Sequence, residues 1–337
     1  MIKDAIAKLV EGRPLTDQEA SFSMREIMDG DASPAQIAAF VTALRLKGET
    51  LEEVLSMSQV MREKSLHVDV EGPVIDTCGT GGDASGTFNI STTVGLVVAG
   101  SGTKVAKHGN RAASGSTGSA DVLEELGVSI QLSPEDVKKC IEETGFGFMF
   151  AQIFHPAMKF AAAPRKEIGI RTIFNTLGPL MNPARANAQV FGMADAGLAN
   201  LVTQFLTKQS VHHALLVHGE DGLDEISLAG KTDVWELKDG TVSTYTVMPD
   251  DFGLDVIDNL ELKVKSIKES ASVIKSILDG DLGPRRDVVL ANASAALVAA
   301  DRAKTFRDGV LIARDAIDSG QSKRVLDHLI ELSQKLN

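Results

Sequence analysis

The chain lacks the features that define several protein classes. It has two cysteines among 337 residues, Cys78 and Cys140, which excludes a disulfide framework and offers no metal-ligand spacing. Every apolar stretch is broken by Gly, Ser or a charged residue well before the roughly 18 residues that a membrane helix needs. Residues 1–5 lead into an acidic, amphipathic stretch without the apolar core of a signal peptide. We therefore expect a cytoplasmic protein that does not bind or span a membrane.

Positive charge and aromatic residues are also scarce. Lys and Arg number 34 against 46 Asp and Glu, so the net charge is −12, and aromatic residues make up 4%. Nucleic-acid binding needs a dense basic surface and, for single strands, aromatic stacking platforms. We therefore expect no nucleic-acid partner. The hydrophobic fraction of 43% is ordinary for a globular protein, and the length allows a small domain beside a large one.

Residues 1–66 carry the signals of consecutive helices. Capping-box patterns occur at residues 16–19 (TDQE), 33–36 (SPAQ) and 50–53 (TLEE). Between the last two, apolar residues within 37–44 recur at the i, i+3, i+4, i+7 spacing of one buried helical face. The first part of the chain is therefore predicted to be all-helical.

The pattern changes at about residue 73, where short apolar runs begin to alternate with helical stretches. This alternation predicts an α/β sheet. The predicted strands are residues 74–76, 104–106, 146–150, 189–193 and 214–217, with helices at 91–99, 121–126 and after Ser133. Asp239 and Gly240 predict a hairpin between residues 232–237 and 241–247. From about residue 264 the chain is again predicted to be helical.

A glycine-rich loop, residues 79–86 (GTGGDASG), lies between a predicted strand and a predicted helix. Glycines let backbone amides approach an anion, and a following helix N-terminus adds partial positive charge, so the loop suits a phosphate or pyrophosphate. A tight turn explains the same residues. The loop formally fits the dinucleotide fingerprint, but residues 97–105 lack the acidic residue that the fingerprint expects.

Three further segments carry hydroxyl, amide or cationic side chains. Residues 89–92 (NIST) can cap a helix or place hydroxyls on phosphate or Mg²⁺. Residues 107–111 (KHGNR), expected to follow a strand, suit an anion site or a solvated basic loop. A Ser- and Gly-rich loop at residues 114–119 follows and supplies more donors, which favours the anion site.

Two charged segments lie further along the chain. Arg165 and Arg171 flank an expected helix start after Pro164, and either is a surface charge or a partner for a carboxylate. Asp224 and Glu225 follow a buried strand, where adjacent carboxylates need a neutralising cation. Mg²⁺ together with a polyphosphate fits, because it prefers one or two carboxylates plus substrate oxygens.

Taken together and in this order, the segments resemble the anthranilate phosphoribosyltransferase family, over nearly the whole chain. The segments that carry the resemblance are residues 76–83 (DTCGTGGD), 88–92 (FNIST), 107–111 (KHGNR), 118–123 (GSADVL), 155–159 (HPAMK), 165–167 (RKE), 171–180 (RTIFNTLGPL) with 182–183 (NP), and 222–225 (GLDE).

The resemblance implies a fold and an activity. It implies a small helical domain, residues 1–68, joined by a central segment at about 163–188, and a larger α/β domain, residues 69–162 and 189–337, with a mostly parallel central sheet. The active site would lie between them, in a homodimer. The implied reaction transfers the phosphoribosyl group of phosphoribosyl pyrophosphate (PRPP) to the amine of anthranilate, with Mg²⁺ as cofactor, in tryptophan biosynthesis.

The resemblance also implies roles for individual residues. The PRPP-binding set is Gly79, Gly82, Asp83, Thr87, Asn89, Ile90, Ser91, Thr92, Lys107 and Ser119; the Mg²⁺ set is Ser91, Asp224 and Glu225; the anthranilate-binding set is Gly79, His108, Asn110 and Arg165. No dedicated acid or base is expected, because catalysis would rest on positioning and electrostatics. Residues 112–117 form a smaller, less basic loop than the family's version.

Two other activities compete with this interpretation. A pyrimidine nucleoside phosphorylase would share the fold, but residues 107–111 and Arg165 suit an aromatic acid better than a pyrimidine. A non-enzymatic relative that binds nucleic acid is disfavoured by the net charge of −12 and the low aromatic content.

Overall fold

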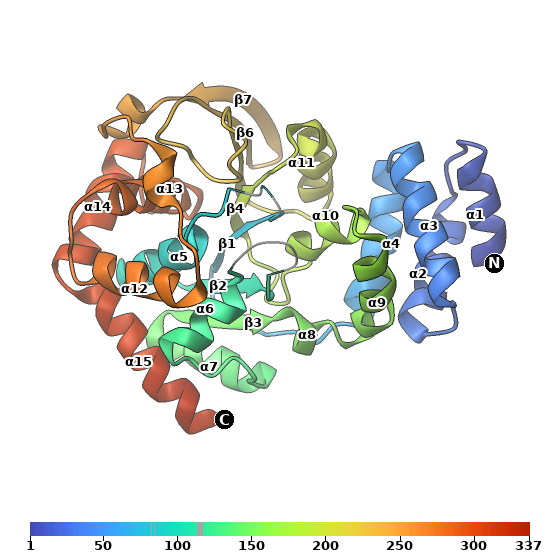
Figure 1. Ribbon diagram of the computed structural model, residues 1–337, viewed down its shortest axis with the longest axis horizontal. Coiled ribbons are helices and arrows are strands. Elements are labelled where there is room, and N and C mark those ends of the chain that lie inside the picture. Colours follow the sequence, from blue (N-terminus) through green and yellow to red (C-terminus); the bar gives the residue numbers. More distant parts are fainter. Residues whose placement is uncertain (82, 84, 113–116) are drawn as a thin grey trace. The chain divides into compact units, whose positions relative to one another are not determined.

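A computed structural model describes residues 1–81, 83, 85–112 and 117–337 (Figure 1). The chain divides into two compact units. The helical unit comprises Met1–His67 and Ala151–Pro183, and the α/β unit comprises Val68–Phe150 and Ala184–Asn337. An all-helical part and a larger part with a mostly parallel sheet confirm the predicted fold class.

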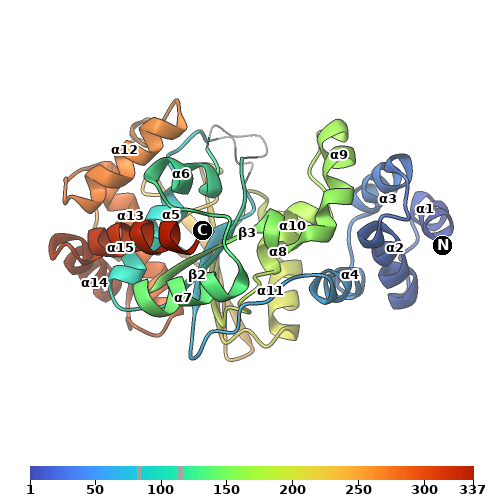
Figure 2. The ribbon, with the colours of Figure 1, turned by 90° about the horizontal axis from the view of Figure 1, so that it is seen from below.

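The helical unit is built from two chain segments. The predicted capping boxes are present at the starts of three helices, where the side chains of Thr16, Ser33 and Thr50 each accept a hydrogen bond from the backbone three residues on. Helix α9 of the second segment packs against α2 and α3, as Figure 2 shows for α3. The elements are α1 (Ile2–Val10), α2 (Asp17–Asp29), α3 (Pro34–Lys47), α4 (Leu51–Glu63), α8 (Ala151–Phe154), η1 (Pro156–Met158), α9 (Lys159–Ile168) and α10 (Ile173–Leu180).

The expected helix start after Pro164 is wrong. Helix α9 begins five residues earlier, at Lys159, and Pro164 lies inside it. A proline inside a helix removes one amide donor and costs about 3 kcal/mol. Pro164 and Ala161 are both buried where α9 packs on its neighbours, and this packing offsets the cost.

The α/β unit contains a seven-stranded sheet in the order β3-β2-β1-β4-β5-β6-β7. The strands are β1 (Ile75–Gly79), β2 (Val105–Gly109), β3 (Phe146–Phe150), β4 (Ala188–Gly192), β5 (His213–Gly219), β6 (Thr232–Lys238) and β7 (Thr241–Val247). The first five strands of that order are parallel, and β6 and β7 are antiparallel. Asp239 and Gly240 both have positive φ, 48° and 77°, as a primed two-residue hairpin turn requires.

Helices cover both faces of the sheet. The connection from β1 to β2 runs one way along the sheet and that from β4 to β5 runs the other, so right-handed crossovers place α5 and α11 on opposite faces (Figure 1). Helix α13 packs against α5. The remaining elements are α5 (Ile90–Gly100), α6 (Ser119–Leu126), α7 (Pro134–Thr144), η2 (Ala196–Leu198), α11 (Ala199–Lys208), η3 (Pro249–Phe252), η4 (Asn259–Leu262), α12 (Ile267–Leu278), α13 (Pro284–Ala299), α14 (Phe306–Asp318) and α15 (Gln321–Leu336). Among the described residues, no helix has the length and apolarity needed to cross a membrane.

Candidate active site

The sheet has a switch point between β1 and β4, where the direction of the strand order reverses. Loops that leave the carboxyl ends of such strands diverge, and open α/β sheets bind ligands there. The carboxyl ends of β1 and β4 are Gly79 and Gly192, which face each other in register. The glycine-rich loop therefore begins at the position where the topology favours a ligand.

Gly79 and Gly192 allow a third segment to approach this edge. A Cβ atom at Gly79 would lie 2.7 Å from Asp224 Oδ2, and one at Gly192 would overlap the backbone carbonyl of Asp224. The amide of Gly81 donates a hydrogen bond to Asp224 Oδ2 at 2.8 Å. The absence of side chains at both strand ends thus brings Asp224 against the glycine-rich loop, 143 residues away in sequence.

Helix α5 begins at Ile90 directly after this loop, and its N-terminus has no side-chain cap. The N-cap residue is Asn89, whose side chain makes no capping hydrogen bond, so the capping explanation of residues 89–92 is not what the structure contains. The amide of Ser91 instead interacts with the carboxylate of Glu225. Ile90 and Thr92 are buried, and the Thr92 hydroxyl has no hydrogen-bond partner among the described residues. Because the Ile90 amide donates to the Phe88 carbonyl at 2.8 Å and the Ser91 amide meets Glu225, the start of α5 offers an anion the positive end of the helix dipole rather than these two amides.

Lys107 lies inside β2, because this strand continues to Gly109 and does not end before residue 107 as expected. The reason is its ladder with β3, which pairs Lys107 with Phe148 and continues to Gly109. Lys107 is 2% exposed, and its Nζ donates to the Thr77 carbonyl and, at 3.2 Å, to Ser91 Oγ. Burial lowers its pKa, while the nearby Asp76, Cys78 and Glu225 raise it.

Asp224 and Glu225 are adjacent, half-buried carboxylates. Burial, followed by the charge of Asp224, raises the pKa of Glu225 well above its usual value, and Lys107 opposes this. No cation lies within ion-pair distance of Glu225 in the described part of the chain. The described residues include no cluster of three or more His, Cys, Asp or Glu side chains suited to a metal. Adjacent carboxylates, with Glu225 near the Ser91 amide, are oxygen ligands of the kind Mg²⁺ prefers, with its other ligands from substrate and water.

A second loop, between β2 and α6, lies on the neighbouring strand. Ser119, the first residue of α6, donates its hydroxyl to the Asn110 carbonyl at 3.3 Å. Asp121 accepts hydrogen bonds from the amides of Ala112 and Gly118, at 3.0 and 3.1 Å, and so closes the loop at its base. Of the expected site, Gly82 and the loop residues 113–116 lie outside the described residues.

The residues expected to contact anthranilate occupy both units. In the α/β unit, His108 is buried with its amide donating to Asp76 at 3.3 Å, whereas Asn110 is exposed. In the helical unit, Arg165 lies in α9 with its guanidinium carbon 5.3 Å from the centre of the Phe174 ring. Burial lowers the pKa of Arg165, and no carboxylate lies within ion-pair distance of it among the described residues.

The structure thus brings Gly79, Ser91, Lys107, Asp224 and Glu225 into one cluster. The charge of Asp83 also acts on Glu225. Thr87 and Asn89 lie further along the loop, and both contact the segment before or within α12. Sequence reasoning missed this contact and the fully buried Asp76, although Asp76 adjoins the glycine motif.

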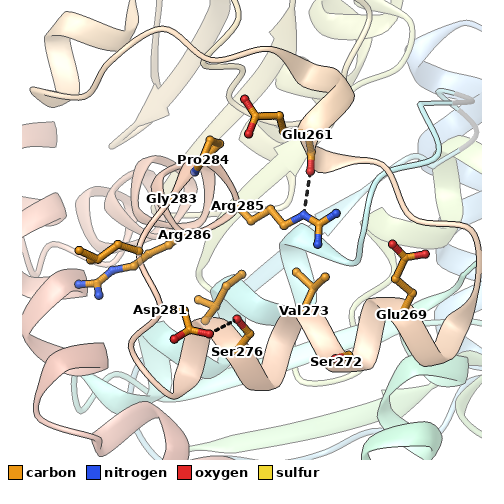
Figure 3. Close-up of a pocket in the computed structure, with 12 residues that line it drawn as sticks. Glu261, Glu269, Ser272, Val273, Ser276, Asp281, Gly283, Pro284, Arg285 and Arg286 are labelled. Atoms are coloured by element: carbon orange, nitrogen blue, oxygen red, sulfur yellow. Dashed lines mark hydrogen bonds between the residues drawn. The ribbon is translucent and has the colours of Figure 1, made fainter.

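A cavity of about 500 Å³ lies apart from this cluster, between η4, α12 and the start of α13 (Figure 3). None of the expected site residues lines it. Its side chains have mixed charge, with Glu261, Glu269 and Asp281 beside Arg285 and Arg286.

Comparison with known proteins identifies the family of this fold and cluster. Residues 3–65 match the helical bundle domain, and residues 71–323 the a/b domain, of the glycosyl transferase family. An anthranilate phosphoribosyltransferase of Dehalococcoides mccartyi is 51% identical over 338 residues, covering 100% of this chain and 99% of that protein. The chain belongs to the anthranilate phosphoribosyltransferase family.

Solved members of the anthranilate phosphoribosyltransferase family share the whole fold. The Thermus thermophilus enzyme superposes with a TM-score of 0.92 at 40% identity, covering 98% of this chain and 99% of that one. The Saccharomyces cerevisiae enzyme, in complex with PRPP and Mg, also has a TM-score of 0.92, at 27% identity, covering 99% and 98%. The yeast enzyme in complex with 4-fluoroanthranilate has a TM-score of 0.89.

Proposed function

We propose that this chain transfers the phosphoribosyl group of PRPP to the amine of anthranilate, releasing pyrophosphate and forming N-(5-phosphoribosyl)anthranilate, a step of tryptophan biosynthesis. The observation that carries the proposal is the cluster at the β1–β4 switch point. It combines the glycine-rich loop, the open N-terminus of α5, the buried Lys107 and the carboxylates of Asp224 and Glu225. The 51% identity of this chain to an enzyme named for this reaction supports the same activity.

The residues fall into three groups by the chemistry that they offer. PRPP would meet the loop and helix start, through Gly79, Gly82, Asp83, Thr87, Asn89, Ile90, Ser91, Thr92, Lys107 and Ser119. Mg²⁺ would be held by Asp224, Glu225 and Ser91. Anthranilate would meet Gly79, His108 and Asn110, and its carboxylate would pair with Arg165, a half-buried guanidinium without a carboxylate partner among the described residues.

The reaction needs no strong base. The bond from ribose C1 to pyrophosphate lengthens, C1 becomes oxocarbenium-like, and the neutral amine of anthranilate attacks C1 as pyrophosphate leaves. The ammonium that forms then loses one proton to water, which gives the neutral secondary amine of the product. When bound, Mg²⁺ supplies positive charge to the phosphate oxygens. Amides of the glycine-rich loop, the dipole of α5 and the charge of Lys107 stabilise the leaving group, and positioning of the reactants contributes roughly 7–11 kcal/mol.

The proposed domains are a helical domain, residues 1–68 joined by about 163–188, and an α/β domain, residues 69–162 and 189–337. The protein acts as a homodimer in the cytoplasm. The dimer follows from the family resemblance and the location from the scarcity of cysteine, and equilibrium sedimentation of the purified chain tests the dimer directly.

Anthranilate fluorescence tests the reaction. We would follow its decay in the presence of PRPP and the purified chain, with and without Mg²⁺. A rapid loss that requires both PRPP and Mg²⁺ is the expected result. No loss at high enzyme concentration contradicts the proposal, and phosphorolysis of thymidine or uridine would then test the competing activity.

A further inference from the structure

Helix α12 fixes the side chain of Asn89 through a single hydroxyl. The backbone amide of Asn89 donates to Ser270 Oγ at 3.1 Å, and Ser270 Oγ donates to the side-chain oxygen Oδ1 of Asn89 at 2.9 Å. The two residues are 181 positions apart, and Ser270 is fully buried. A serine hydroxyl has one donor hydrogen and accepting lone pairs, so it can make both bonds at once.

The second of these bonds decides which way the side-chain amide of Asn89 faces. Because Oδ1 is held by Ser270, Nδ2 points to the other side, where it donates to the Thr117 carbonyl at 3.3 Å. Nδ2 carries two hydrogens, and this contact uses one of them. The side of Asn89 turned away from α12 therefore offers a donor, as an anionic substrate needs, and the opposite orientation would offer a carbonyl oxygen.

The loop that carries Asn89 is held independently of Ser270. The Phe88 amide donates to the Leu262 carbonyl, and the Val264 amide donates to the Gly86 carbonyl, both at 3.0 Å. Arg285 in turn holds this second segment, since its Nε donates to the Glu261 carbonyl at 2.7 Å (Figure 3). Loss of the Ser270 hydroxyl should therefore leave Gly86 and Phe88 in place, while it releases the side chain of Asn89 and removes the acceptor of the Asn89 backbone amide.

We propose that Ser270 is a positioning residue for PRPP, which acts by fixing the amide orientation of Asn89. The inference rests on the proposed function, because Asn89 belongs to the proposed PRPP-binding set. It assigns to α12, which supplies none of that set, a role in the specificity of the site for an anion.

The test compares Ser270→Ala with Ser272→Ala, which alters an exposed serine of the same helix. We expect Ser270→Ala to raise the KM for PRPP about tenfold, the effect of one hydrogen bond to a charged group, with the KM for anthranilate unchanged. Ser272→Ala should leave both values unchanged. A PRPP KM for Ser270→Ala equal to that of Ser272→Ala, or an equal rise in both KM values, overturns the inference.

A double-mutant cycle separates this role from a merely structural one. If Ser270 acts through Asn89, adding Ser270→Ala to an Asn89→Ala variant has no further effect on the KM for PRPP. If the two substitutions raise the KM for PRPP by factors that multiply in the double variant, the inference is contradicted. Turnover by the unaltered chain in the same assay distinguishes the two levels, because its absence refutes the proposed function, whereas its presence with no Ser270 effect refutes only the role of Ser270.

Discussion

The helical unit and the α/β unit each contain a glutamate whose carboxylate is at least partly shielded from water, Glu53 and the half-buried Glu225, and the two differ in their partners. Glu53 in α4 is fully buried, and it is fully partnered. It pairs with Lys47 at 2.7 Å and accepts hydrogen bonds from the amides of Leu15 and Thr50 at 2.8 and 2.9 Å. Glu225 has the adjacent Asp224 as its neighbour and no ion pair within the part of the chain that the structure describes.

This difference separates a structural charge from a functional one. Burying an ion is costly, and only a partner with good geometry compensates the cost. At Glu53 the partner belongs to the chain, so the group is complete after folding. At Glu225 the charge of Lys107 offsets part of the cost, and in the proposed function a bound Mg²⁺ supplies the rest. Incomplete compensation therefore marks the site more specifically than the presence of a carboxylate does.

Removal of the site carboxylates should have the largest effect on activity. Asp224→Asn combined with Glu225→Gln should lower kcat by roughly 10²–10³-fold and weaken the dependence on Mg²⁺, because the charge that holds the cation is lost. Thermal unfolding should stay unchanged or shift upward, since two repelling carboxylates are removed. The measurements are steady-state kinetics over a range of Mg²⁺ concentrations and a melting curve. A strongly destabilised variant would mean that the two carboxylates stabilise the fold, as Glu53 does.

Neutralising Glu53 should lower the stability of the fold and leave the kinetic constants unchanged. Glu53→Gln leaves the ammonium of Lys47 buried without its partner, which costs about 3–5 kcal/mol of unfolding free energy. Urea unfolding measures this loss. The kinetic constants of the remaining folded enzyme should match those of the parent chain. A selective loss of kcat at unchanged stability would overturn the contrast between the two glutamates.

The same contrast extends to two buried or half-buried arginines. Arg286 is 3% exposed and pairs with Asp318 at 2.6 Å, whereas Arg165 has no such partner among the described residues. Arg165→Ala should raise the KM for anthranilate about tenfold to a hundredfold with little change in kcat, because a charge-assisted pair with the substrate carboxylate is lost. The exposed neighbour Lys166→Ala is the matched control. Equal effects on kcat and on the KM for both substrates would contradict a binding role.

Exposed charges should give the smallest effect. The hydrogen bond to Asp301, with further contributions from both Asp301 and Asp239, raises the pKa of His212 above its usual 6.5. This stabilisation is complete below pH 6.5 and is lost as the pH rises through the folded value. Solvent screening limits it to about 0.5 kcal/mol. Urea unfolding between pH 5.5 and 8.5 should show the slope, and His212→Gln should flatten it while the exposed His328→Gln should not.

Much of the fold can be predicted from the sequence because its signals are local. A capping box closes within four residues, as at Thr16 and Ser33, and Asp239 with Gly240 encodes the β6–β7 hairpin in two positions. Period and length of the apolar runs locate the remaining strands and most helices to within a few residues. The predicted start of α9 is wrong because burial of Pro164 is a tertiary effect that no local signal carries.

The same distinction between local signals and tertiary contacts applies to the site. Its segments are recognisable in the sequence, since glycine, hydroxyl and carboxylate residues cluster within short motifs. The tertiary structure alone decides that Lys107 is buried in a strand beside Ser91, that Asp224 lies against Gly79, and that Ser270 orients Asn89. These contacts join residues 16, more than 140 and 181 positions apart, so strand order and helix packing determine them, and no local pattern can. Local patterns reveal which chemical groups the chain carries, and only strand order and helix packing decide which of these groups meet in the site.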